Sequence, residues 1–144
     1  MRADVLHQLV VLQSLRAARE RELALQAARR SQTARRQAEQ AQAALANRQA
    51  GWQRRLAADV MGVADFGNAR AAIDAARGLA AEAQARLDGA LAETERAREA
   101  YRAADAAATA LQGVHAQALK RQRRAADERQ LLQAEDRQTA RLTR

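Results

Sequence analysis

A seven-residue repeat between Ile73 and Ala118 constrains the fold of this chain more than any other feature of its sequence. Because a straight α-helix drifts about 20° per heptad against such a repeat, keeping the pattern over about six heptads requires a left-handed supercoil with a partner helix. The stretch is therefore predicted to be one half of a coiled coil. The repeat positions lie alternately three and four residues apart, and they are Ile73, Ala76, Ala80, Ala83, Leu87, Ala90, Thr94, Ala97, Tyr101, Ala104, Ala108, Leu111, His115 and Ala118.

The composition also predicts long helices and a thin core. The 144 residues include 41 alanines, six glycines, three aromatic residues and no proline, which is typical of helices rather than of a sheet or a layered domain. Two helices supply no walls for a sizeable pocket, so we expect a non-enzymatic protein without a cofactor. Cysteine is absent, which excludes thiolate metal sites and disulfides.

The chain is expected to turn back once. Gly62 and Gly67 bound the only turn-like segment, where a glycine can adopt the left-handed conformation that ends a helix and Asp65 or Asn68 can cap the next one. This predicts helix 1 over about 5–61, a turn over about 62–68 and helix 2 over about 69–141, all within a single elongated domain spanning 1–144. The fold class is then all-α, an antiparallel two-helix coiled-coil hairpin with a longer C-terminal helix.

A turn centred near residue 65 fixes which residues should face one another. Paired residue numbers would add to about 130, which places Glu95 near Arg35 and His115 near Leu15 rather than near His7. We interpret His115 as a polar seam residue, since no further ligands accompany it at metal-binding spacing. Tyr101 and Trp52 are likewise interpreted as seam residues.

The two ends of the chain differ in character from its middle. Helix 1 opens with its most apolar segment, which includes Leu9, Leu12 and Leu15, and continues with a looser stripe (Leu23, Leu25, Ala38, Ala41, Leu45 and Trp52). Helix 2 should overhang helix 1 over roughly residues 126–144. Its end is rich in cations, namely Lys120, Arg121, Arg123, Arg124, Arg129, Arg137, Arg141 and Arg144.

No membrane segment is expected. The longest apolar run is Leu9 to Leu12, far short of the roughly 20 residues that a membrane span needs. Asp4, His7 and Gln8 interrupt the region where the core of a signal peptide would lie. We therefore expect a cytoplasmic protein.

Three stretches of the sequence resemble a known family. The opening LHQLVVLQSLRAARERELAL, the glycine-bounded turn and the closing ALKRQRRAADERQLLQAEDRQTAR are similar to the stalk proteins of bacterial type III export, the FliJ/YscO group of flagella and injectisomes. In that family an antiparallel two-helix coiled coil, similar to the γ stalk of rotary ATP synthases, inserts its paired termini into a hexameric export ATPase. It also meets the export gate protein and secretion chaperones. This chain differs in being richer in alanine and poorer in aromatic residues.

The resemblance implies a cytoplasmic protein peripheral to the inner-membrane secretion apparatus, with these partners. Leu9, Leu12, Leu15, Arg16 and Arg19 match the opening of the family, and Arg129, Leu132, Glu135, Asp136 and Arg141 match its charged closing helix. Together with the basic residues of the predicted tip, they give a predicted ATPase-binding set of Leu9, Leu12, Leu15, Arg16, Arg19, Arg121, Arg123, Arg124, Arg129 and Leu132.

Two other functions remain open from the residues alone. A generic coiled-coil scaffold or adaptor would show the same heptads. A basic rod that binds nucleic acid would account for the net charge of +8. Against the latter, carboxylates alternate with the cations, and the basic tail has no aromatic residue to stack on a base. We therefore expect no DNA partner.

Overall fold

The computed structural model describes residues 3–59 and 61–142, which form two α-helices, α1 (Ala3–Ala57) and α2 (Val63–Leu142). Over this part of the chain the all-α prediction is confirmed. Helix α2 has 80 residues and α1 has 55, so the second helix is the longer one, as predicted. Arg144, one of the cations of the predicted tip, lies outside the described residues.

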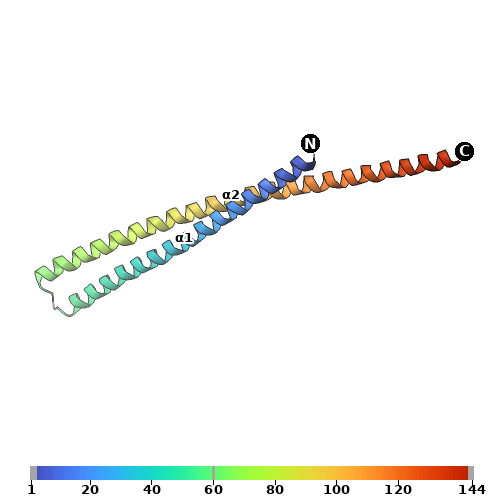
Figure 1. Cartoon of the computed structure of the whole chain (residues 1–144). Helices are drawn as coiled ribbons and strands as arrows, with labels where there is room; N and C mark the ends of the chain where they lie inside the picture. Colours follow the sequence, from blue (N-terminus) through green and yellow to red (C-terminus); the bar gives the residue numbers. More distant parts are fainter. Residues whose placement is uncertain (1–2, 60, 143–144) are drawn as a thin grey trace. The chain divides into compact units, whose positions relative to one another are not determined.

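The chain divides into two compact units, each of which contains a part of both helices. The turn unit comprises residues 21–99, and the terminal unit comprises residues 1–20 and 100–144. In the turn unit, α1 and α2 run side by side in opposite directions from the connection that joins them (Figure 1). Ala38 of α1 packs there against Ala83 and Leu87 of α2.

The heptad positions of α2 lie where the repeat predicts. All 14 positions from Ile73 to Ala118 are buried or half-buried. Every other residue between Ile73 and Ala118 is exposed, and the half-buried neighbours Ala72 and Leu119 directly flank this stretch. The least exposed are Ala80 at 2%, Thr94 at 4% and Ala108 at 4%. The repeat thus identifies the face of α2 that packs against α1.

The predicted stripe on α1 is only partly correct. Leu23 and Leu25 are 43% and 45% exposed. In contrast, Ala24, which lies between them, and the nearby Ala27 are buried. The face that packs against α2 follows its own heptad of small and polar residues, so hydrophobicity alone does not reveal it. This face comprises Leu6, Val10, Gln13, Ala17, Glu20, Ala24, Ala27, Ser31, Ala34, Ala38, Ala41 and Leu45.

The turn comes earlier than predicted and is built differently. Helix α1 ends at Ala57, and α2 already begins at Val63, so most of the predicted turn 62–68 is helical. The left-handed residue is Asp59, with φ of 54°, and no described glycine has positive φ. The Phe66 amide donates a hydrogen bond of 3.0 Å to the Gly62 carbonyl, which makes Gly62 the residue that starts α2 rather than one that ends α1.

Because the turn is centred near residue 60, the predicted register is wrong by about nine residues. The Thr94 hydroxyl lies 3.1 Å from the Ala27 carbonyl. The residue numbers of this pair, one from each helix, add to 121, whereas the predicted sum is about 130. The Glu95 carboxylate lies 4.0 Å from Arg98 of its own helix. Arg35 lines the same groove as these two residues, but the helix pairing no longer sets it opposite Glu95.

The terminal unit continues the antiparallel pairing within its own residues. Ala17 of α1 packs against Ala104 and Ala108 of α2. The His7 and His115 rings meet with their centroids 5.7 Å apart. This contact corrects the prediction that His115 lies near Leu15. Every described residue of α2 from Lys120 onward is exposed, so the unpaired end begins about six residues earlier than predicted.

Candidate partner-binding surface

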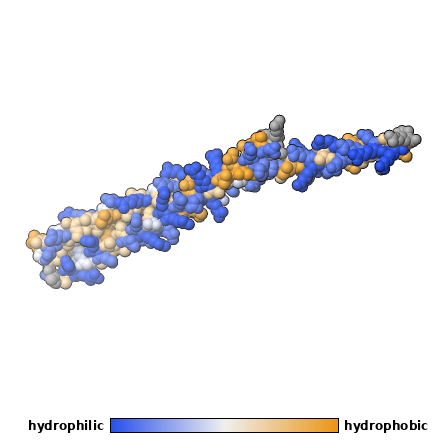
Figure 2. All heavy atoms as spheres, viewed as in Figure 1, coloured by the Kyte–Doolittle hydropathy of each residue, from blue (hydrophilic) through white to orange (hydrophobic). Residues whose placement is uncertain are grey.

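The predicted apolar strip at the start of α1 divides between two faces of the helix. Leu9 is half-buried toward α2, whereas Leu12 and Leu15 are 61% and 62% exposed. Val5 and Val11 are exposed as well. Figure 2 shows apolar side chains gathered on the visible face of these first turns. The exposed strip of Val5, Val11, Leu12 and Leu15 therefore lies away from the seam and is free to meet a partner.

Two of the predicted arginines accompany this strip. Arg16 follows Leu12 by four residues, and Arg19 follows Leu15 by four residues, so each arginine lies one turn beyond a leucine on the same helix face. Both arginines are exposed. The arrangement combines apolar area with positive charge. We call Val5, Val11, Leu12, Leu15, Arg16 and Arg19 the α1 surface.

The second group of predicted residues lies on the unpaired end of α2. Arg121, Arg123, Arg124 and Arg129 are all exposed, and hydrophilic side chains dominate this end on the visible face (Figure 2). The Arg129 Nε donates a hydrogen bond of 3.0 Å to the Ala125 carbonyl of the preceding turn. This bond holds the guanidinium group of Arg129 along its own helix.

Leucines interrupt the basic residues of this end. Leu131 is 64% exposed and the predicted Leu132 is 60% exposed. Large apolar side chains this open to water are a feature of interaction sites when they gather in one region. We call residues 120–142 the α2 extension. The α1 surface and the α2 extension belong to the same terminal unit.

A separate apolar cluster lies at the connection of the turn unit. Trp52 and Phe66 stack edge to face with ring centroids 5.1 Å apart. A pocket of about 320 Å³ beside them is lined by Leu56, Met61 and Val63 among others. Val63 is 94% exposed. The half-buried position of Trp52 agrees with its interpretation as a seam residue.

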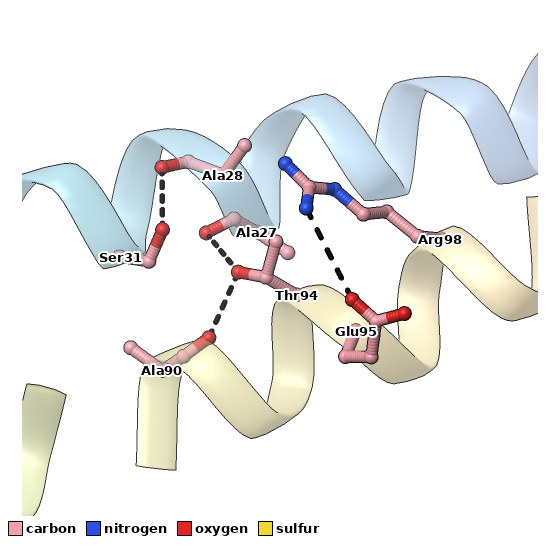
Figure 3. Close-up of polar contacts among 7 residues, drawn as sticks. All are labelled: Ala27, Ala28, Ser31, Ala90, Thr94, Glu95 and Arg98. Carbon is pink, nitrogen blue, oxygen red and sulfur yellow. Dashed lines mark hydrogen bonds and ion pairs between the residues drawn. The ribbon is translucent and has the colours of Figure 1, made fainter. Parts of the chain in front are cut away.

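A groove between the helices of the turn unit has a polar floor. Its volume is about 550 Å³. The Thr94 hydroxyl lies 2.8 Å from the Ala90 carbonyl and 3.1 Å from the Ala27 carbonyl, and the Ser31 hydroxyl donates to Ala28 at 2.9 Å (Figure 3). These bonds satisfy the two hydroxyl groups locally, so the other polar groups of the groove come from Gln32, Arg35, Glu95 and Arg98.

Sequence reasoning missed the contact between His7 and His115. They are the two histidines of the chain. The heptad of α1 would have shown that they face each other, but the polar residues Gln13 and Glu20 at its seam positions make this heptad hard to recognise. Among the described residues, no group of three or more histidine, cysteine, aspartate or glutamate side chains is arranged to hold a metal ion. Neither helix, over the same residues, has an apolar stretch long enough to cross a membrane.

Comparison of the chain with protein-family models, with curated proteins and with solved structures finds no match.

Proposed function

We propose that this protein is a non-enzymatic central stalk of a type III protein-export ATPase, built as an antiparallel two-helix coiled coil. The observation that carries the proposal is the terminal unit, where an exposed apolar and basic surface on α1 accompanies an unpaired basic extension of α2. Such an end suits the interior of a hexameric ring. The resemblance of the opening, turn and closing segments to the FliJ/YscO group supports the same function.

The two surfaces would contribute differently to binding. Leu12 and Leu15 bury apolar area against a partner, which supplies most of the affinity at about 25 cal/mol per Å². Arg121, Arg123 and Arg124 attract acidic loops of the ring and orient the stalk as it enters. Because exposed charge pairs contribute only about 0 to 1 kcal/mol each, charge would govern the association rate more than the affinity.

The partners of the stalk other than the ATPase would bind surfaces outside the terminal unit. An export gate protein and secretion chaperones are the further partners that the resemblance implies. The apolar cluster of Leu56, Val63 and Phe66 gives the turn unit a surface of its own for one of them. The protein would then act in the cytoplasm beside the inner-membrane secretion apparatus.

A cognate export ATPase provides the direct test. Leu12→Asp, or reversal of Arg121, Arg123 and Arg124 to glutamate, should abolish stimulation of ATP hydrolysis and protein export. These side chains are exposed, so helicity measured by circular dichroism should be unchanged. Leu56→Asp and the double reversal of Arg54 and Arg55 to glutamate are matched controls in the turn unit, and they should still stimulate.

The alternatives predict different results. Full stimulation of ATP hydrolysis by the terminal variants, together with loss of stimulation in the turn variants, would show that the turn unit and not the terminal unit binds the ATPase. Absence of any ATPase binding would favour a generic coiled-coil scaffold. A DNA or RNA affinity that falls steeply with salt and is lost in the arginine reversals would favour a nucleic-acid binder.

A further inference from the structure

The two histidines of this chain are 108 positions apart in sequence and in contact in the fold. The centroids of their rings are 5.7 Å apart, and the ring planes are inclined by 47°. His7 comes from the first turns of α1, and His115 occupies a seam position of α2. His7 is exposed and His115 is half-buried, so small solutes can reach the pair from water.

The spacing of the rings is close to that of two imidazoles on one metal ion. With metal–nitrogen distances of about 2.1 Å and a tetrahedral angle, two bound imidazoles have ring centroids about 5 Å apart. The observed separation of 5.7 Å is slightly longer, so both side chains must rotate for their ring nitrogens to share one ion. The inclination of the planes is no obstacle, since each ring can turn about its own metal–nitrogen bond.

We propose that His7 and His115 form a two-histidine site for a divalent transition metal such as Zn²⁺ or Ni²⁺. Imidazole nitrogen is a preferred ligand of both ions. With two protein ligands, the ion keeps open coordination positions for water or for a group of a partner. The site does not depend on the function proposed above.

Metal binding at this pair would fasten the start of α1 to α2. In the unfolded chain the two histidines are separated by a long loop, so closing it around one ion costs conformational entropy that the folded chain has already lost. The ion therefore binds the folded terminal unit more tightly than the unfolded chain, and it stabilises the fold by mass action.

Calorimetric titration of the full chain, purified without a polyhistidine tag, tests the site with ZnCl₂ and NiCl₂. One ion should bind per monomer near neutral pH, and the thermal midpoint by circular dichroism should rise with metal concentration. MgCl₂ should do neither, because Mg²⁺ prefers oxygen ligands. His7→Gln and His115→Gln should each weaken Zn²⁺ binding by about tenfold or more and remove the shift of the midpoint.

His7→Gln is the decisive variant, because an exposed side chain can be replaced without disturbing the seam. Zn²⁺ binding of unchanged affinity in His7→Gln would overturn the proposal. So would metal-driven dimerisation of the parent chain in sedimentation experiments, since that result would place the two ligands on different copies. Loss of binding in both variants with retained helicity is the result that supports the site.

Discussion

At the scale of single residues, Thr94 places a hydroxyl group in a seam made mostly of alanine. Its side chain is 4% exposed, and its oxygen lies near the carbonyls of Ala27 and Ala90. Both carbonyls lie within helices, where backbone amides already supply them with donors. The hydroxyl therefore adds a contact between the helices without being needed to satisfy either acceptor.

Replacement of Thr94 tests this interpretation. Thr94→Val removes the hydroxyl and keeps the shape, so the free energy of unfolding should change by less than about 1 kcal/mol. Thr94→Ser keeps the hydroxyl and loses a buried methyl group, which should cost about 1 kcal/mol. Urea denaturation followed by circular dichroism measures both. A greater loss in Thr94→Val than in Thr94→Ser would show that the hydrogen bond to Ala27 holds the helices together.

At the scale of the helices, the sequence predicts one face well and the other poorly. The repeat of α2 marks its buried positions because residues that are apolar, small or weakly polar recur without interruption at three- and four-residue spacing. On α1 the matching positions include Gln13, Glu20 and Ser31. These residues pack beside small alanines, and a pattern based on hydrophobicity cannot distinguish them from surface residues. Leu23 and Leu25, which the pattern favours, are exposed instead.

The error in the register has a physical cause as well. In the sequence, Gly62 and Gly67 suggest helix ends because glycine commonly adopts the left-handed conformation. Here Asp59 adopts that conformation, as aspartate can at modest cost. Moving the turn by about five residues shifts every facing pair by about nine. The predicted leucines and arginines of the partner surface are exposed, except for Leu9, which is half-buried.

Glycines inside α2 are sites where the helix can be stabilised. An added methyl group at Gly78 or Gly89 would meet no atom within 4 Å, so Gly78→Ala and Gly89→Ala should each raise the free energy of unfolding by about 0.5 to 1 kcal/mol. Gly62→Ala is the control, because alanine is a poor residue at a helix start. Thermal and urea denaturation should rank the two helix variants above the parent and Gly62→Ala at or below it. Equal gains at all three sites would contradict the assigned helix start.

At the scale of the whole molecule, stability should be low for a chain of this length. The buried positions are mostly alanines, and no large side chain of the described residues is fully buried. Three ion pairs on α2 join residues one turn apart, with both partners exposed, and such pairs contribute little. The small buried apolar area must therefore offset the conformational entropy that is lost when two long helices are ordered.

Thermal denaturation of the protein alone checks this expectation. The midpoint should lie at or below the range of about 45 to 65 °C that ordinary domains show, and a partner that binds the folded state should raise it in proportion to the logarithm of its concentration. A midpoint above about 80 °C without a partner would contradict the account of the seam. Circular dichroism at 222 nm is suitable, since it follows the loss of helix directly.

The edge-to-face contact of Trp52 with Phe66 gives the chain a built-in spectroscopic probe. Trp52 is the one tryptophan of the sequence, and it belongs to the turn unit. The imidazole proton signals of His7 and His115 come from the terminal unit alone. Tryptophan fluorescence and histidine NMR signals can thus follow the melting of the two units separately in unlabelled protein, and any difference between their transitions measures how independently the units unfold.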